Sequence, residues 1–187
     1  MRYPASETAE KHERILNEAA KLFRERGFAG VGVAEIMQAA GLTHGAFYAH
    51  FKSKDDLAAE ALVRAFSQSS DRAYADSSNA TEAKKVFLER YLSARHRDRP
   101  GAGCAIAALG AEIARDAAVR VPFTEEVKRM ITGMAKSFGW KSRSSARQNA
   151  VHLLSAVVGA LILARAVDDA KLSDEILASV RKQLAST

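Results

Sequence analysis

The stretch GLTHGAFYAHFKSKDDL, residues 41–57, decides the fold that the sequence predicts. Its first residues, Gly41-Leu42-Thr43, break a short helical pattern that runs from Val33 to Ala40. A second short pattern then continues to about Phe51, and the Thr43 hydroxyl is suited to cap its first turn. Two short helices joined by a three-residue turn that contains glycine are typical of a helix-turn-helix DNA reader.

The residues after the turn have the chemistry that such a reader needs. No Asp or Glu occurs between Glu35 and Asp55, so no carboxylate there repels the phosphates of DNA. Thr43 and Tyr48 offer hydroxyls that can contact phosphate oxygens, and Gly45 lets the backbone approach DNA closely. The same pattern also fits a small helical subdomain that binds no DNA.

Helical patterns extend outward from this stretch in both directions. Apolar residues follow one face from Ala9 to Arg26, and Gly27 is placed to end that helix. On the other side, Ser53 is suited to cap a helix that reaches about Ala75, and residues 96–103 are predicted to form a loop. No segment alternates as a strand does, so we predict an all-α fold of about nine helices. The remaining helices are predicted over residues 81–95, 104–116, 122–137, 144–167 and 173–184.

The composition narrows the class of protein. The 187 residues are 48% hydrophobic and 27% charged, which is globular and excludes a mostly disordered chain. One cysteine excludes an intramolecular disulfide, and one Cys with five scattered His predicts neither a metal site nor a cofactor. The first residues lack the apolar core of a secretory signal, so a cytoplasmic location is expected. The most apolar stretch, between Arg147 and Arg165, is short for a membrane span and predicts a buried helix of a soluble bundle.

The net charge is less informative than its distribution. Lys and Arg total 28 and Asp and Glu 22, which gives a formal charge of +6. Residues 1–57 hold eight basic and eight acidic residues, so the whole excess lies after residue 57. DNA affinity is therefore expected to come from the acid-free run 36–54. The later excess predicts a solvated basic face, with preference for an anionic effector or steering toward DNA as alternatives.

The run from Gly41 to Leu57 resembles the recognition segment of TetR-family transcriptional repressors. In that family Gly-Leu/Val-Ser/Thr-x-Gly-x-Leu/Phe-Tyr-x-His/Tyr-Phe-x-Ser/Asn-Lys-Glu/Asp-x-Leu spans the turn and the parts of the helices around it. The segment from Arg14 to Phe28 resembles the first helix of the family. Many members begin the second helix with Ser or Thr, whereas this chain has Gly32-Val33-Ala34, so one side-chain phosphate contact is expected to be missing.

The resemblance implies a repressor that works as a homodimer. Its heads, residues 1–52, would bind a palindromic operator in double-stranded DNA, and residues 53–187 would bind a small-molecule effector and form the dimer. Effector binding would change the separation of the heads and release the DNA. Carried over by position, the DNA contacts are Thr43, His44, Gly45, Tyr48, His50 and Lys52.

The last two predicted helices resemble those through which TetR-family dimers form a four-helix bundle. The first of them is apolar nearly all round, which predicts burial on every side. The expected interface residues are Leu153, Leu154, Val157, Leu161, Ile162, Ile176 and Val180. The expected effector pocket is lined by Phe66, Phe87, Tyr91, Cys104, Leu109, Phe138, Trp140 and His152, each of which also fits plain core.

Cys104 supports an alternative hypothesis. It stands at a predicted helix start, where the helix dipole favours thiolate. The segment from Gly103 to Ile106 resembles one found in a TetR subgroup that includes electrophile- and hypochlorite-sensing repressors, although Arg165 stands where such a sensor has a lysine. Two further alternatives are an enzyme that uses Cys104 with His96 or His152 as base, and a helical interaction protein that binds no DNA.

Overall fold

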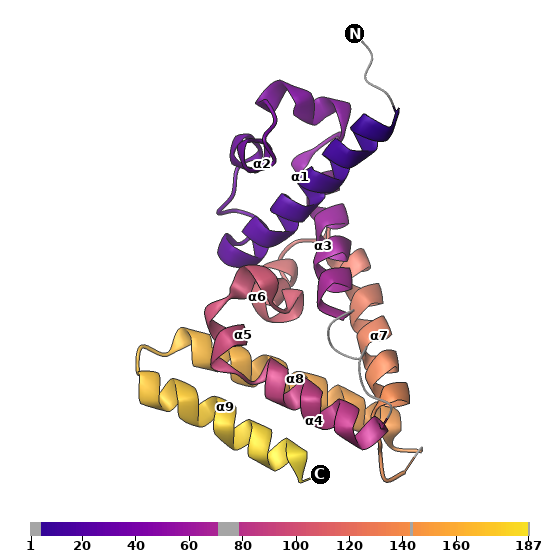
Figure 1. The fold of residues 1–187 in the computed structure, drawn as a ribbon, viewed down its shortest axis with the longest axis vertical. Helices are drawn as coiled ribbons and strands as arrows, with labels where there is room; N and C mark the ends of the chain where they lie inside the picture. The colour runs from indigo at the N-terminus through magenta and orange to yellow at the C-terminus, as the bar shows by residue number, and fades with distance from the viewer. Residues whose placement is uncertain (1–4, 71–78, 143, 187) are drawn as a thin grey trace.

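The computed structural model describes residues 5–70, 79–142 and 144–186 of the chain. In those residues it contains nine α-helices, two 3-10 helices and no strand, which confirms the predicted all-α class. The molecule is elongated, with the N-terminal helices at one end and the C-terminal helices at the other (Figure 1).

The head consists of α1 (Ala5–Arg26), α2 (Val33–Ala39) and the 3-10 helix η1 (His44–Ala49). Gly27 ends α1 with a φ of 76°, and Gly41 turns the chain after α2 with a φ of 70°, conformations that side chains with a Cβ rarely adopt. Both predicted glycine breaks are therefore confirmed. Gly32 is the N-cap of α2 and provides no side-chain hydrogen bond, as the sequence predicts.

The body begins below α3 (Lys54–Ser70), which descends from the head. Its other helices are α4 (Ala80–Tyr91), α5 (Ala94–Asp98), η2 (Pro100–Ala102), α6 (Ala105–Ile113), α7 (Arg120–Ser137), α8 (Ala146–Ala166) and α9 (Ala170–Ala185). One hydrophobic core joins the head to α3 and α6, and a second joins α4, α7, α8 and α9. Ile106 on α6 packs against both cores, so α6 lies at the junction of head and body.

Three details of the local prediction are wrong. The second helix of the helix-turn-helix is a 3-10 helix, and its N-cap Thr43 makes no side-chain cap. Residues 96–103 are not a loop, because α5 and η2 occupy most of them. The helix predicted over 81–95 ends at Tyr91, and Ser93 then caps α5 by accepting a hydrogen bond from the His96 amide at 3.2 Å. The predicted end of α3 near Ala75 lies outside the described residues.

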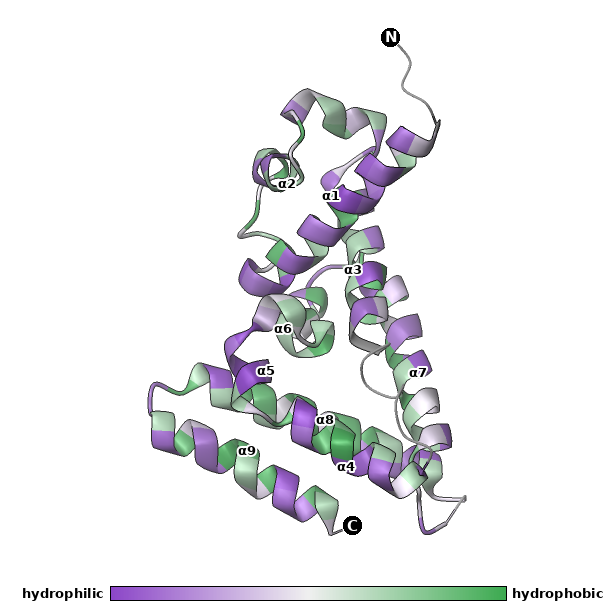
Figure 2. Ribbon diagram, in the orientation of Figure 1, coloured by the Kyte–Doolittle hydropathy of each residue, from purple (hydrophilic) through white to green (hydrophobic). Residues whose placement is uncertain are grey.

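Helix α8 is apolar along most of its length (Figure 2). In the described part of the chain, it is the one helix whose length and hydropathy would suffice to cross a membrane. Leu153, Leu161 and their neighbours on one side pack into the second core, but Ile162 and Leu163 are 43% and 56% exposed. Within one protomer this helix is therefore not buried on every side, because one face is covered by no part of the described chain.

Candidate nucleic-acid interface

The 3-10 helix η1 is fixed by its inner face and open on its outer face. Phe47 is 2% exposed, and its ring lies against that of Phe51, with 5.7 Å between ring centroids. These two aromatic side chains belong to the first core and hold η1 against α1 and α2. The outer face carries the residues that the sequence predicts to contact DNA: Thr43, His44, Gly45, Tyr48 and Lys52 are exposed, and His50 is half-buried at the C-terminal end.

Tyr48 is the most prominent side chain of this surface. It is 72% exposed, although a tyrosine in a folded protein usually buries much of its ring. Phe47 and His44 contact its ring edge-on, with centroids at 5.3 and 6.5 Å, so the phenol is oriented even without a partner. A preoriented hydroxyl on an acid-free surface is suited to donate a hydrogen bond to a phosphate oxygen.

Gly45 is not required by the packing of the head. A Cβ placed there would have no neighbour within 4 Å among the described residues, and the φ of Gly45 is not positive. The open space at this position is where a molecule outside the chain could approach the backbone.

The chain leaves η1 through a well-defined helix start. The Ser53 hydroxyl accepts a hydrogen bond from the Asp56 amide at 3.0 Å, and the Asp56 carboxylate accepts one from the Lys52 amide at 3.2 Å. These reciprocal bonds form a capping arrangement that fixes Lys52 immediately before α3. Lys54, by contrast, is directed inward, because its ammonium donates to the Phe28 carbonyl at 2.6 Å.

Arg24 connects the head to the rest of the molecule, and the sequence analysis did not identify this role. Its residue exposure is only 5%. The guanidinium donates to the Gly101 carbonyl at 2.9 Å, to the Ala65 carbonyl at 3.1 Å and to the Gln68 side chain at 2.9 Å. One cation at the end of α1 therefore joins the head to both α3 and η2. A second link is made by Glu112 on α6, whose carboxylate accepts from the Phe28 amide at 2.9 Å.

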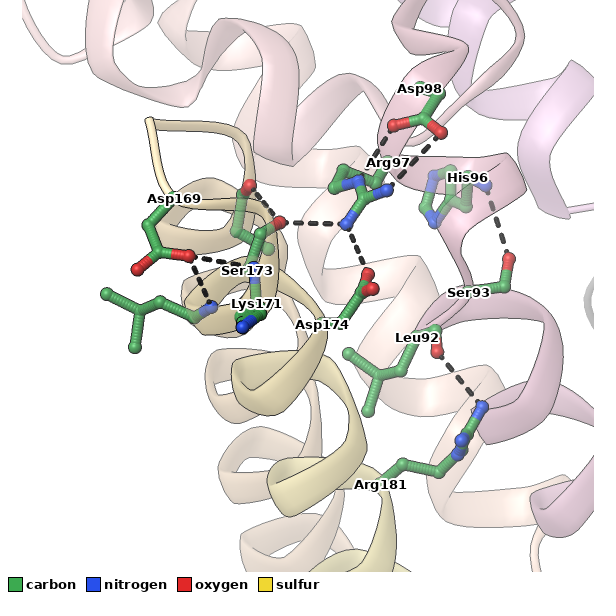
Figure 3. Close-up of polar contacts among 12 residues, drawn as sticks. Leu92, Ser93, His96, Arg97, Asp98, Asp169, Lys171, Ser173, Asp174 and Arg181 are labelled. Atoms are coloured by element: carbon green, nitrogen blue, oxygen red, sulfur yellow. Dashed lines mark hydrogen bonds and ion pairs between the residues drawn. The ribbon is translucent and has the colours of Figure 1, made fainter. Parts of the chain in front are cut away.

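The α4–α6 connection, residues 92–104, is bound to the C-terminal helices through its backbone and through the Arg97 side chain, which donates to Ser173 at 2.9 Å and to Asp174 at 2.7 Å (Figure 3). Arg165 on α8 donates to the carbonyls of His96 at 2.8 Å and Arg97 at 3.0 Å. Arg181 on α9 donates to the Leu92 carbonyl at 3.3 Å. Since Arg24 binds the Gly101 carbonyl of the same connection, this segment contacts the head and the α8–α9 pair at once.

His96 holds the two ends of this connection together. Its Nδ1 donates to the Tyr91 carbonyl at 2.7 Å, and its Nε2 accepts from the Cys104 amide at 3.0 Å. A carbonyl can only accept and an amide can only donate, so this geometry requires the neutral ring with its proton on Nδ1. Burial lowers the pKa of His96, the hydrogen bond to Tyr91 partly opposes this, and the charge of Arg165 lowers the pKa further.

Comparison with known proteins shows which family and which structures this chain resembles. Residues 15–61 match the model for "Bacterial regulatory proteins, tetR family", which covers the second half of α1, all of α2 and η1, and the beginning of α3. A TetR transcriptional regulator from Chloroflexus aurantiacus has the same fold, with a TM-score of 0.76, 26% identity, and coverage of 97% of this chain and 95% of that one. The N-terminal part of the chain, residues 15–61, therefore matches the tetR family.

Two other relatives show how the similarity is distributed. The transcriptional regulator AcuR of Cereibacter sphaeroides is 33% identical over 109 residues, which are 54% of this chain and 48% of that protein. The reduced form of Escherichia coli NemR shares the fold at a TM-score of 0.76 with 19% identity, covering 94% of this chain and 95% of NemR. The chain spans about half or less of the length of the first curated relatives it matches.

The residues predicted to line one effector pocket are divided between the two hydrophobic cores. Phe66 and Leu109 belong to the first core, whereas Phe87, Tyr91, Cys104, Phe138 and Trp140 belong to or pack on the second. His152 is exposed on α8. The described structure does not gather all eight side chains in one core, and the pocket stays a prediction. A surface hollow of about 340 Å³ lies elsewhere, between the end of α1, the start of α3 and the end of α6.

The predicted dimer residues also divide into two groups. Leu153, Leu154, Val157 and Leu161 are at most 5% exposed and fill the second core of their own protomer, so they are not available to a second copy. Ile162 is exposed, and Ile176 and Val180 on α9 are half-buried. The face left open on α8 and α9 carries three exposed apolar side chains that the sequence analysis did not select, namely Val151, Leu163 and Leu172.

Cys104 is the N-cap residue of α6, as predicted, but its side chain is inside the protein. The residue is 4% exposed and belongs to the second core. His96, one of the two bases considered for a catalytic pair, already has both ring nitrogens engaged by backbone groups, and His152, the other, is on the exposed face of α8. The structure thus favours neither the enzyme nor the thiol-sensing alternative over a regulator that binds DNA through η1.

Proposed function

We propose that this protein is a DNA-binding transcriptional repressor that releases its operator when a small-molecule effector binds. The observation that carries the proposal is the outer face of η1, where Tyr48 and Lys52 are exposed in the acid-free segment 36–54 and the buried Phe47 fixes the helix. In the proposed complex η1 enters the major groove, His44 and Gly45 approach base edges, and Tyr48 and Lys52 bind phosphates. Residues 1–52 would then read DNA, while residues 53–187 bind the effector and form the dimer.

The test is a mobility-shift titration with DNA from the region upstream of the protein's own gene. Because Lys52 is proposed to bind a phosphate, Tyr48→Phe combined with Lys52→Ala should weaken binding and lower the salt dependence by about one unit in log–log slope. Lys136→Ala is the matched control, since it removes an equally exposed lysine from α7, and it should leave both quantities unchanged. Unchanged binding by the double variant would mean that η1 does not read the DNA.

We further propose that the active form is a homodimer with a twofold axis across α8 and α9. Val151, Ile162 and Leu163 on α8, with Leu172 on α9, place several large apolar side chains on neighbouring helices, and each is at least 42% exposed. Large apolar side chains exposed on neighbouring helices are unfavourable in water and are suited to an isologous contact. Light scattering coupled to size exclusion should give twice the protomer mass of 20.2 kDa, whereas a monomeric mass at micromolar concentration would contradict it.

The effector is proposed to act through the joint between head and body. The contacts that support this are those of Arg24 and Glu112, because both connect the end of α1 to segments of the body. A molecule that shifts α6 or η2 would therefore tilt α1 and the attached η1. The protein is proposed to act in the cytoplasm, where its DNA is, and the mechanism requires no catalytic step. A thermal-shift screen of small molecules, followed by the mobility shift with each stabilising compound, tests this part.

A further inference from the structure

His50 at the C-terminal end of η1 lies against a second histidine that comes from α1. The ring centroids of His12 and His50 are 6.0 Å apart. The His12 ring also stacks on Phe51, with 4.6 Å between centroids and planes inclined by 21°. Since Phe51 is 2% exposed and part of the first core, its ring holds His12 in place beside His50.

The charges around this pair come from three elements. On α1, Lys11 lies next to His12 and forms an ion pair with Glu7 at 2.8 Å. On α3, the Glu60 carboxylate lies 3.1 Å from His12 Nε2, and the Asp56 carboxylate is engaged by the Lys52 amide. In residues 43–52, which are proposed to face DNA, Lys52 follows His50 by two residues, and His44 lies against Tyr48.

These surroundings disfavour a positive charge on His50 in the free protein. Burial lowers the pKa of His50, and positive charge on His12 and on Lys11 lowers it further. The Glu60 carboxylate does not directly oppose the lowering of the His50 pKa, because it is bound to His12 and not to His50. At neutral pH the His50 ring is therefore mostly uncharged, and one of its nitrogens can only accept a hydrogen bond.

A phosphate diester reverses this balance. A DNA phosphate carries a full negative charge and accepts hydrogen bonds, so it binds an imidazolium with two N–H donors much better than a neutral ring. A group that is neutral when free and charged when bound takes up a proton on binding, and the affinity then rises as the pH falls.

We propose that His12 and His50 form a proton-linked pair, in which contact of His50 with a DNA phosphate takes up a proton and His12 sets the pH at which this occurs. His12 is thus a positioning residue for DNA recognition, although it lies on α1 and not in the helix-turn-helix. The inference rests on the proposed function, because it needs DNA at the face of η1.

The first experiment measures the affinity for duplex DNA from the upstream region between pH 6.0 and 8.0, at constant ionic strength. Because one proton changes the affinity by at most tenfold per pH unit, binding should be about three- to tenfold tighter at pH 6.0 than at pH 8.0. His50→Gln keeps a side-chain donor but cannot titrate, so it should remove most of this dependence. His152→Gln is the matched control, since it removes an exposed histidine from α8, and it should keep the dependence.

The second experiment follows the His50 ring by NMR in the protein without DNA. His12→Phe keeps an aromatic ring against Phe51 but removes the charge, so the titration midpoint of His50 should move to higher pH. The pH dependence of DNA affinity should move in the same direction, which a role in packing alone would not produce. Lys11→Gln should cause a smaller shift of the same sign and does not alter the ring stack.

The outcomes separate this inference from the proposed function. DNA binding that is independent of pH, or that keeps its pH dependence in His50→Gln, would overturn the proton linkage while leaving a DNA-binding protein. An unchanged His50 midpoint in both His12→Phe and Lys11→Gln would overturn the role of His12. Absence of DNA binding at every pH would contradict the proposed function, and the proton linkage with it, although the free-protein titration would still report whether the two rings are coupled.

Discussion

Replacing Arg24 by methionine should destabilise the protein by more than its position at the surface end of a helix suggests. Methionine keeps most of the length of the side chain but removes the guanidinium, so the change isolates the three hydrogen bonds at 2.9, 3.1 and 2.9 Å. The Gly101 and Ala65 carbonyls lie in a buried site that water does not easily reach, because Gly101 and Ala65 are themselves buried.

The magnitude follows from what each acceptor loses. A buried acceptor that loses a charged donor costs about 1–3 kcal/mol, whereas the half-buried Gln68 amide can bind water instead and costs little. Removal of a buried charge also returns part of the desolvation cost that the native protein carries. Together these contributions predict a loss of about 2–4 kcal/mol in the free energy of unfolding.

Arg26→Met is the matched control for this change. Arg26 stands two residues further along the same helix and donates to Glu35 at 2.5 Å, but both side chains are 44% exposed. An exposed pair of this kind contributes about 0–1 kcal/mol. Urea unfolding followed by circular dichroism, at equal protomer concentrations, compares the two variants. If Arg24→Met is no more destabilising than Arg26→Met, then the joint between head and body does not depend on the buried guanidinium.

Three further changes test other parts of the structure. Burial lowers the folded-state pKa of His96 below its ordinary value of 6.5, so the free energy of unfolding should be undiminished above pH 6.5 and should fall as the pH decreases toward the folded-state pKa. In chemical denaturation, His96→Gln should flatten this part of the pH profile. Ile162→Glu should convert the proposed dimer to monomer, because it places a carboxylate within the exposed apolar face of α8, and a dimeric mass in light scattering would contradict this. Gly41→Ala should cost about 1 kcal/mol in unfolding experiments because φ is 70° there, whereas Gly45→Ala should leave stability within about 0.5 kcal/mol and weaken DNA binding instead.

The head could be predicted from the sequence because its signals are local. Gly27 and Gly41 end helices through their own backbone conformation, and Ser53 caps α3 by bonding an amide three residues away. Ser93 gives the same kind of signal for α5, and it could have corrected the prediction that Pro100 and the glycines around it form a loop.

The contacts of Arg24 that join the head to the body could not be predicted, because the carbonyl groups that it binds have no signature in the sequence. Arg24 bonds to carbonyls 41 and 77 residues away, and every residue type has a carbonyl. In the sequence it is simply a cation near the end of a helix, which is a common position for one.

The sequence also could not predict which face of α8 is buried and which is exposed. Leucine, valine and isoleucine occur all round this helix, so hydropathy did not separate Leu161, which is fully buried, from its neighbours Ile162 and Leu163. Only the packing of α5, α6, α7 and α9 against α8 shows which positions remain open. The residues of the predicted effector pocket are divided between the two cores for a similar reason, because aromatic side chains were grouped without knowledge of which core each one enters.

The α4–α6 connection has a consequence for how this protein can change during evolution. Arg24, Arg165 and Arg181 come from three different helices and hold it by carbonyl oxygens alone. Substitutions within residues 92–104 that preserve the backbone path leave those oxygens in place, whereas one inserted or deleted residue would displace several of them together. Apart from Ser93, His96 and Arg97, whose side chains make contacts of their own, this segment should therefore be variable in side chains but constant in length among proteins that keep the three arginines.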